Sequence, residues 1–214
     1  MRTVRLFTTV AALAMATAPL VEAVGFKTVV GTPGNDTLYG TPESDRIYGY
    51  AGQDFLYGGK GNDRLDGGSG QDHLKGGPGN DVIIGGRPRA PVDESTPHGP
   101  HEYIRGGTGN DVITIRGAGV VIWAGPGDDR IDLRDPLDDC KFRHGALAAA
   151  DAPARALDPL HCVDLVNTGP GDNFVRADDG NYDGIDCFGR RDRVVVDQYD
   201  YVNENCDVVR RVKR

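Results

Sequence analysis

Aromatic residues are scarce in this sequence, and basic residues are not in excess. Phe, Trp and Tyr make up 7% of the 214 residues, and the formal net charge is -8. So few large rings argue against a thick conventional core and favour a narrow, stacked one. The acidic balance argues against binding to nucleic acid, which needs a basic face. It favours a cationic partner instead, such as a metal ion.

Complete catalytic motifs are also missing. The sequence contains no Gly-x-Ser-x-Gly nucleophile elbow and no Gly-Lys-Ser/Thr phosphate loop. His101-Glu102 begins like the zinc protease motif His-Glu-x-x-His, but Arg105 stands where the second histidine would be. A surface metal shared by His98 and His101 is the weaker interpretation, because transition-metal sites use three or four ligands. We therefore expect no catalytic activity, while the many carboxylates leave a glycosidase-like pair open.

Long apolar segments are limited to one, residues 6–20 near the N-terminus. Arg2 and Arg5 precede it, and Ala23 suits the position before a signal peptidase site. The segment is short for a membrane span and is interrupted by a proline. We therefore expect residues 1–23 to be a cleaved secretory signal peptide, which leaves an extracellular chain without a membrane span. An uncleaved membrane anchor is the alternative.

Cysteine is scarce as well. The four cysteines are Cys140, Cys162, Cys187 and Cys206. In an oxidising compartment they can form two disulfides, for which the sequence allows three connectivities. We expect local pairing, Cys140 with Cys162 and Cys187 with Cys206. A metal site is the weaker interpretation, because the sequence has no Cys-x-x-Cys element.

Glycine, in contrast, is abundant, with 31 residues, and many of them lie in a repeat of nine. In the unit GGKGNDRLD, residues 58–66, glycines come first, an aspartate is at position six and an aliphatic residue is at position eight. The aspartates of six consecutive units are Asp36, Asp45, Asp54, Asp63, Asp72 and Asp81, and the aliphatic residues are Leu38, Ile47, Leu56, Leu65, Leu74 and Ile83. Such a period is typical of a repeat fold.

Each unit predicts a turn followed by a very short strand. Glycine allows backbone angles closed to other residues, so positions one to six form the turn. Positions seven to nine, such as Arg64-Leu65-Asp66, form the strand. Two units make one flattened coil, and stacked coils form two parallel sheets with strands ~4.8 Å apart. Position eight points into the core, and positions seven and nine face water. The predicted fold class is all-β, a parallel β-roll, which is a two-sheet solenoid.

The aliphatic register continues across two insertions. Ile83 and Ile104 are 21 residues apart, which is one repeat of nine plus an insertion of 12. Ile131 and Val166 are 35 residues apart, which is one repeat of nine plus an insertion of about 26. We therefore predict a single β-roll domain over residues 24–214. Its parts are regular repeats at 31–86, an inserted loop at 87–102, a second repeat block at 103–132, an inserted loop at 133–164, and degenerate repeats with a Cys-containing C-terminal cap at 165–214.

The acid and the aliphatic residue share one period because stacking brings every second aspartate together. We expect Asp36, Asp54 and Asp72 along one edge of the roll, and Asp45, Asp63 and Asp81 along the other. Like charges at that separation repel by roughly 1 kcal/mol in water and more where partly desolvated. A hard divalent cation removes the repulsion, and Ca²⁺ suits carboxylate and carbonyl ligands better than Mg²⁺ does. Several Ca²⁺ ions are the expected cofactors.

Residues 31–86 resemble the calcium-binding repeats of the repeats-in-toxin (RTX) family, whose nonapeptide GGxGxDxUx, with U large and aliphatic, forms a calcium-loaded parallel β-roll. GGTGNDVIT and AGPGDDRID, within residues 106–132, match in part. The resemblance implies a secreted bacterial protein. It also implies side-chain ligands at Asp36, Asp45, Asp54, Asp63, Asp72, Asp81, Asp111 and Asp129, and carbonyl ligands at Gly34, Gly52, Gly61, Gly70 and Gly79.

The sequence departs from the family pattern at two positions of the repeat. Glu43 replaces a glycine, and Val120 occupies an acid position. Because the C-terminal region is degenerate, we place no ion site beyond Asp132.

The main hypothesis is a secreted calcium-binding protein that folds when it binds its ions. One alternative is a surface adhesion or scaffold module, with a saccharide or cell-surface ligand held by outward side chains. These side chains are Tyr39, Tyr48, Tyr57, Arg46 and Arg64. The other alternative is a calcium-dependent extracellular hydrolase.

Overall fold

Short parallel strands make up the ordered part of the chain. The structure, a computed structural model, describes residues 26–86, 102–117, 119–133, 164–178, 183–189, 191–198, 200–206 and 208–212. This part of the chain has strands and no helix, and so none that is long and apolar enough to cross a membrane. The expected signal peptide lies outside the described residues, as do residues 87–101 and 134–163 of the two inserted loops.

The strands are mostly three or four residues long. They are β1 (Thr28–Val30), β2 (Thr37–Tyr39), β3 (Arg46–Tyr48), β4 (Phe55–Tyr57), β5 (Arg64–Asp66), β6 (His73–Pro78), β7 (Val82–Ile84), β8 (Glu102–Thr108), β9 (Val112–Thr114), β10 (Val120–Trp123), β11 (Arg130–Asp132), β12 (Asp164–Asn167), β13 (Phe174–Ala177), β14 (Asp183–Asp186), β15 (Arg193–Val196), β16 (Tyr201–Val202) and β17 (Val208–Arg211).

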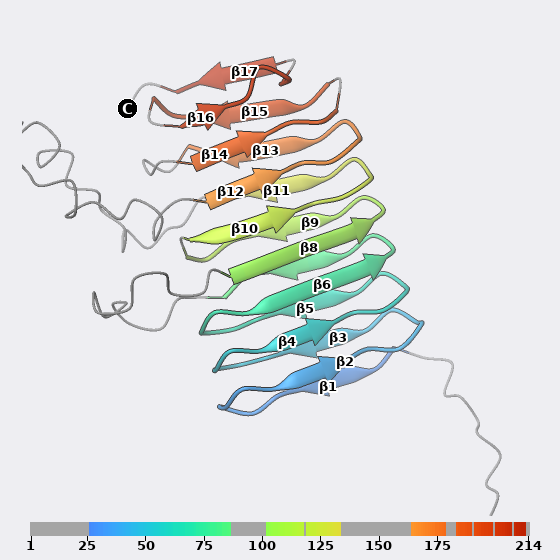
Figure 1. Cartoon of the computed structure of the whole chain (residues 1–214). Helices are drawn as coiled ribbons and strands as arrows, with labels where there is room; N and C mark the ends of the chain where they lie inside the picture. The colour runs from blue at the N-terminus through green and yellow to red at the C-terminus, as the bar shows by residue number, and fades with distance from the viewer. Residues whose placement is uncertain are drawn as a thin grey trace, which may run out of the picture.

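Consecutive strands alternate between two parallel sheets. The odd-numbered strands form a nine-stranded sheet from β1 to β17, and the even-numbered strands form an eight-stranded sheet from β2 to β16. Figure 1 shows the flattened coils stacked one above the other, with one strand of each sheet per coil. The predicted all-β, two-sheet parallel solenoid is confirmed.

The aliphatic residues at position eight form the core between the two sheets. Each pairs with the residue at the same position of the next coil. Leu56 pairs with Leu74 in one sheet, and Leu65 pairs with Ile83 in the other. All four side chains are almost fully buried. A column of such residues removes apolar surface from water along the whole stack, so no strand has to be stable by itself.

The register predicted across both insertions is also confirmed. Leu74 pairs with Ile104, and Ile122 pairs with Val166, so the strands after each inserted loop continue the same two sheets. Residue 102 is already the first residue of β8, one residue earlier than predicted. The segment expected to be a cap contains β15, β16 and β17, which add further strands to both sheets before the chain ends.

Close backbone contact between coils explains the glycines at position four. Gly70 has φ 136°, in the left-handed region, and an ideal Cβ there would lie 1.7 Å from the carbonyl oxygen of Gly52, one coil away. Any other residue would therefore suffer both backbone strain and overlap with a neighbouring coil. Gly34 is different, because an ideal Cβ on this residue would have Thr32 Oγ1 as its nearest neighbour, at 3.7 Å.

Two alanine substitutions test this difference. We expect Gly70→Ala to lower the free energy of unfolding by about 2 kcal/mol or more, because strain and overlap add. The matched change Gly34→Ala, in the same position of its repeat, should stay within about 0.5 kcal/mol. Urea unfolding of the calcium-loaded chain, followed by circular dichroism, measures both. Equal losses would contradict the stacking explanation.

Candidate metal centre

The aspartates at position six form one row along each edge of the roll. In each row, the backbone N–H of one aspartate donates to Oδ1 of the aspartate one coil further on. The first row contains Asp45, Asp63, Asp81, Asp111 and Asp129, joined by bonds of 2.7 to 2.8 Å. The second row begins with Asp36, Asp54 and Asp72, joined at 2.9 Å. The prediction that every second aspartate comes together is confirmed.

The second oxygen of most of these carboxylates has no donor. Among the described residues, the Oδ2 atoms of six row aspartates are buried and accept no hydrogen bond. These belong to Asp54, Asp63, Asp72, Asp81, Asp111 and Asp129. Leaving such an oxygen without a partner costs free energy, and the cost is larger for an ionised group. The rows are therefore unfavourable as long as the protein alone supplies their partners.

Burial shifts these carboxyl groups toward their neutral form. It raises the pKa of Asp63, Asp72 and Asp129 to about 6, and that of Asp81 and Asp111 to about 7. In each case desolvation is the largest cause, and the charge of the neighbouring aspartate adds to it, while the N–H donated to Oδ1 opposes the shift. The pKa of Asp54 is raised for the same reasons. The ionised form of each row is therefore unfavourable unless a positive charge lies beside the carboxylates.

Backbone carbonyls face the same space as the free carboxylate oxygens. An ideal Cβ on Gly86 would lie 2.7 Å from Asp72 Oδ2, 2.9 Å from the Gly70 oxygen and 3.6 Å from the Gly68 oxygen. Positions two, four and six of one repeat therefore direct oxygens toward one small space. An ideal Cβ on Gly58 would similarly lie 2.4 Å from Asp63 Oδ2.

This donor set suits calcium. Ca²⁺ accepts six to eight oxygen ligands, including carboxylates and carbonyls. In the described part of the chain, no three Asp, Glu, His or Cys side chains converge on one point. Any ion must therefore draw most of its ligands from the backbone, as Gly68 and Gly70 would provide.

The carbonyl ligands expected from the resemblance lie in these turns. Gly52, Gly61, Gly70 and Gly79 all have positive φ and stack on the equivalent position of a neighbouring coil. Gly34 does not have this backbone conformation. The individual ligands stay a prediction, with the oxygens around Asp72 as the clearest case.

Two predicted ligands have their second oxygen satisfied by the protein. Asp36 Oδ2 accepts bonds from the Thr32 N–H at 2.5 Å and the Thr32 hydroxyl at 2.9 Å. Asp45 Oδ2 accepts the same pair of bonds from Thr41. Threonine stands at position two of these units, where the regular repeats have glycine. The other six aspartates of the rows are therefore the ones whose free oxygens suit an ion.

Acid positions continue beyond Asp132, where we expected no ion site from the sequence. They are Asp164, Asp183, Asp192 and Asp200, with Asn173 at a further position of the same register. Each lies two residues before an inward aliphatic side chain, and that spacing, continued past Ile131, would have found them. Glu102 occupies the equivalent position earlier in the chain, at the start of β8. Its burial raises its pKa to about 8, and its Oε1 accepts the Gly86 N–H at 2.7 Å. Val120 interrupts the second row, and its N–H donates to Asp164 Oδ1 at 3.0 Å.

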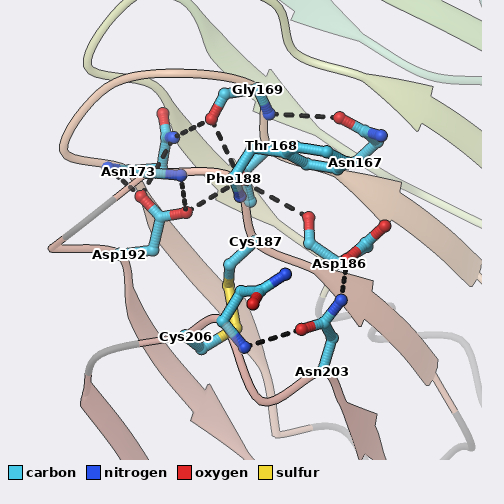
Figure 2. Close-up of a disulfide and its surroundings, with 12 residues drawn as sticks. Asn167, Thr168, Gly169, Asn173, Asp186, Cys187, Phe188, Asp192, Asn203 and Cys206 are labelled. Carbon is cyan, nitrogen blue, oxygen red and sulfur yellow. Dashed lines mark hydrogen bonds between the residues drawn. A yellow bond between two sulfur atoms is a disulfide. The ribbon is translucent and has the colours of Figure 1, made fainter.

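Protein donors replace an ion around Asn173 (Figure 2). The Asn173 amide nitrogen donates to the Gly169 oxygen at 3.2 Å and to Asp192 Oδ1 at 3.1 Å. The Thr168 hydroxyl donates to Asp192 Oδ2 at 2.8 Å. Both oxygens of Asp192 are thereby satisfied, so this turn has no need of a cation.

A disulfide strengthens the same region. Cys187 is joined to Cys206, as predicted (Figure 2). Asn203, which directly follows β16, lies beside this bond, and its amide donates to Asp186 Oδ1. The disulfide and this hydrogen bond both connect the coil of β14 to the coil of β16. The predicted Cys140–Cys162 bond lies outside the described residues.

The outward tyrosines and arginines do not form one surface. Tyr39 and Tyr57 lie on the eight-stranded sheet, where their rings stack at 4.9 Å. Tyr48, Arg46 and Arg64 belong to β3 and β5 of the opposite sheet. The alternation of units between two sheets separates them. His98 and His101 lie outside the described residues.

Comparison with known families agrees with the geometry of the rows. The family described as "RTX calcium-binding nonapeptide repeat (4 copies)" matches residues 30–65, 57–87 and 101–114. The chain therefore carries RTX repeats, and repeats of this kind bind calcium. Searches among curated proteins and among solved structures gave no match.

The raised pKa values predict that acid replaces calcium in part. A carboxyl group whose pKa is higher in the folded state stabilises the fold below its unfolded pKa, near 4, and this contribution is lost as the pH rises through the folded pKa. Without calcium, we expect more β signal in circular dichroism at pH 5 than at pH 8, since the relevant values are about 6 to 7. A flat profile between these pH values would contradict the assignment of the rows.

Exchanging one amide for a carboxylate tests the ion-free turn. Asn173→Asp removes both amide donors and places a second carboxylate beside Asp192. We expect a loss of about 2 kcal/mol or more in the free energy of unfolding without calcium. The control Asn167→Asp keeps the oxygen that accepts the Gly169 N–H and should have little effect. Urea unfolding in chelator measures both, and equal losses would show that the amide has no special role.

Proposed function

We propose that this chain is a secreted bacterial protein that binds several calcium ions in its repeats and folds as it binds them. The observation that carries the proposal is the set of six buried Oδ2 atoms without a donor. Such oxygens are unfavourable in the folded chain alone and become ligands when a cation is present. The RTX match supports calcium as the cation.

The residues proposed to hold calcium come from the turns at both edges of the roll. Carboxylates of the two rows would provide side-chain oxygens, and glycines at positions two and four would provide carbonyls. The bound ion supplies positive charge that neutralises the stacked carboxylates. Glycine contributes the turn conformation, and it also makes the free chain more disordered, which increases the dependence of folding on the ion.

Folding without calcium is expected to be confined to the C-terminal part. The hydrogen bonds of Asn173 and Thr168 and the Cys187–Cys206 bond stabilise this part without a cation. The middle coils, from Asp54 to Asp129, have unsatisfied oxygens in both rows. We therefore propose that calcium orders the middle of the roll against a C-terminal part that is already folded.

Export through the signal peptide at residues 1–23 belongs to the same proposal. Extracellular calcium is plentiful, so the chain would fold after it leaves the cell. The RTX repeats support this location, because proteins that carry them are typically secreted by bacteria. We assign no catalytic residue. Turnover of a substrate that depends on a carboxylate outside the two rows would contradict that part of the proposal.

Calorimetric titration with Ca²⁺ and then Mg²⁺ tests the main proposal. We expect residues 24–214 to bind several calcium ions, with a gain of β signal in circular dichroism and little response to magnesium. The triple variant Asp54→Asn, Asp63→Asn and Asp72→Asn should lose calcium binding at those coils, since it removes the buried carboxylates. It should also retain more structure in chelator, because the repulsion is gone.

A single outward carboxylate provides the matched control. Asp66 lies at position nine and its Oδ1 is 3.5 Å from Arg116 on the outer face. Asp66→Asn should leave the number of bound calcium ions unchanged. Equal calcium binding by the wild type and the triple variant would rule out the rows as the ion sites.

A further inference from the structure

The outer face of the eight-stranded sheet carries a groove that the calcium rows do not explain. Side chains at positions seven and nine stand on either side of it. One hollow of about 370 Å³ extends from β4 to β10, and a second of about 480 Å³ extends from β10 to β16. Trp123 lines both. The two hollows meet at the Trp123 ring, which stacks on Tyr103 at 6.1 Å. Together, as one groove, they cross seven strands, or six steps of ~4.8 Å, a length of roughly 29 Å.

Stacked rings form one wall of the first hollow. Phe55 stacks on His73 at 4.5 Å, and His73 stacks on Tyr103 at 5.0 Å, across β4, β6 and β8. Each inner ring has its faces against its neighbours, so ring edges line the groove. Ring edges carry the positive end of the aromatic quadrupole. Although the rings are apolar, their positive edges favour contact with a negatively charged or hydroxyl-bearing ligand.

Two cations stand on the other wall. Lys75 and Arg105 are exposed at position nine of β6 and β8, and the Arg105 guanidinium lies 5.2 Å from the centre of the Trp123 ring. None of the residues that line this hollow is acidic. The wall is therefore locally cationic, although the chain as a whole has a net charge of -8.

The second hollow offers hydrogen-bonding groups beside apolar ones. Asn167 and Asn203 line it, together with Asp186 and the exposed side chains of Leu165 and Tyr201. Amides both donate and accept, which suits hydroxyl groups. The groove therefore changes along its length from cationic and aromatic to amide-rich.

We propose that this groove binds a linear acidic polysaccharide. The two hollows follow one another along successive strands of the same sheet, which fits a linear polymer that lies along the stack. Carboxylates of the sugar units would pair with Lys75 and Arg105, and their hydroxyls would bond to Asn167 and Asn203. Nucleic acid fits less well, because single-stranded bases bind by stacking on aromatic faces, and the faces of the His73 and Tyr103 rings are covered by neighbouring rings.

Trp123 makes the proposal directly measurable, since it is the only tryptophan in the chain. We expect a saturable change in its fluorescence when the calcium-loaded full chain is titrated with short fragments of polygalacturonate, polymannuronate or hyaluronan. Methyl-esterified oligogalacturonate is the matched neutral ligand and should bind more weakly. Failure of every acidic fragment to bind to the folded chain would overturn the proposal, as would equal binding of the neutral ester.

Charge-removing variants locate the ligand. Lys75→Gln and Arg105→Gln should each raise Kd by at least about tenfold, because each removes a charged partner. The control is Arg130→Gln on the opposite sheet, where Arg130 lies 5.0 Å from the Phe174 ring in a similar arrangement. It should leave Kd unchanged.

Two further outcomes would count against the groove. A control variant that weakens binding as much as Arg105→Gln would place the ligand elsewhere. Tighter binding of single-stranded DNA, lost in the groove variants, would replace the polysaccharide by a nucleic acid. Circular dichroism and the number of bound calcium ions show that each variant is folded and loaded, so failure of this proposal is distinct from failure of the proposed calcium function.

Discussion

The hydrogen bond from the N–H of one aspartate to the carboxylate of the next coil is the constraint on which the structure depends. It holds neighbouring coils at the strand spacing and fixes the register of both sheets. It also uses one oxygen of each carboxylate and buries the other among like charges, as at Asp63 and Asp81. The same contact that orders the backbone thereby creates a need for cations.

The chain meets that need in two ways. In the middle coils, the free oxygens of residues such as Asp72 face glycine carbonyls, an arrangement that suits calcium. Near Asp36 and Asp192, threonine hydroxyls and an asparagine amide supply the missing donors. A single register therefore supports both ion-dependent and ion-independent coils, and the residue beside the acid decides which kind forms.

Much of this architecture was predictable because one period carries it. The spacing of Leu65 and Ile83 predicted the core and the strand register, and it survived both insertions. The sequence did not reveal which carboxylates have donors, since that depends on contacts between a turn and the next coil. Asn173 and Thr168 look like departures from the repeat until their hydrogen bonds are seen. The groove was likewise hidden, because neighbouring residues along each of its walls are 17 or more positions apart in the sequence.

Val120 makes the two edges of the roll unequal. The row that begins at Asp45 runs without a break to Asp129 and on to Asn173. The other row has a valine where a carboxylate would link Glu102 to Asp164. Repeats in a solenoid influence only their neighbours. Folding can therefore propagate from coil to coil along the edge that contains the Asp45 row. The opposite edge is divided at Val120 into two segments that fold more independently of each other.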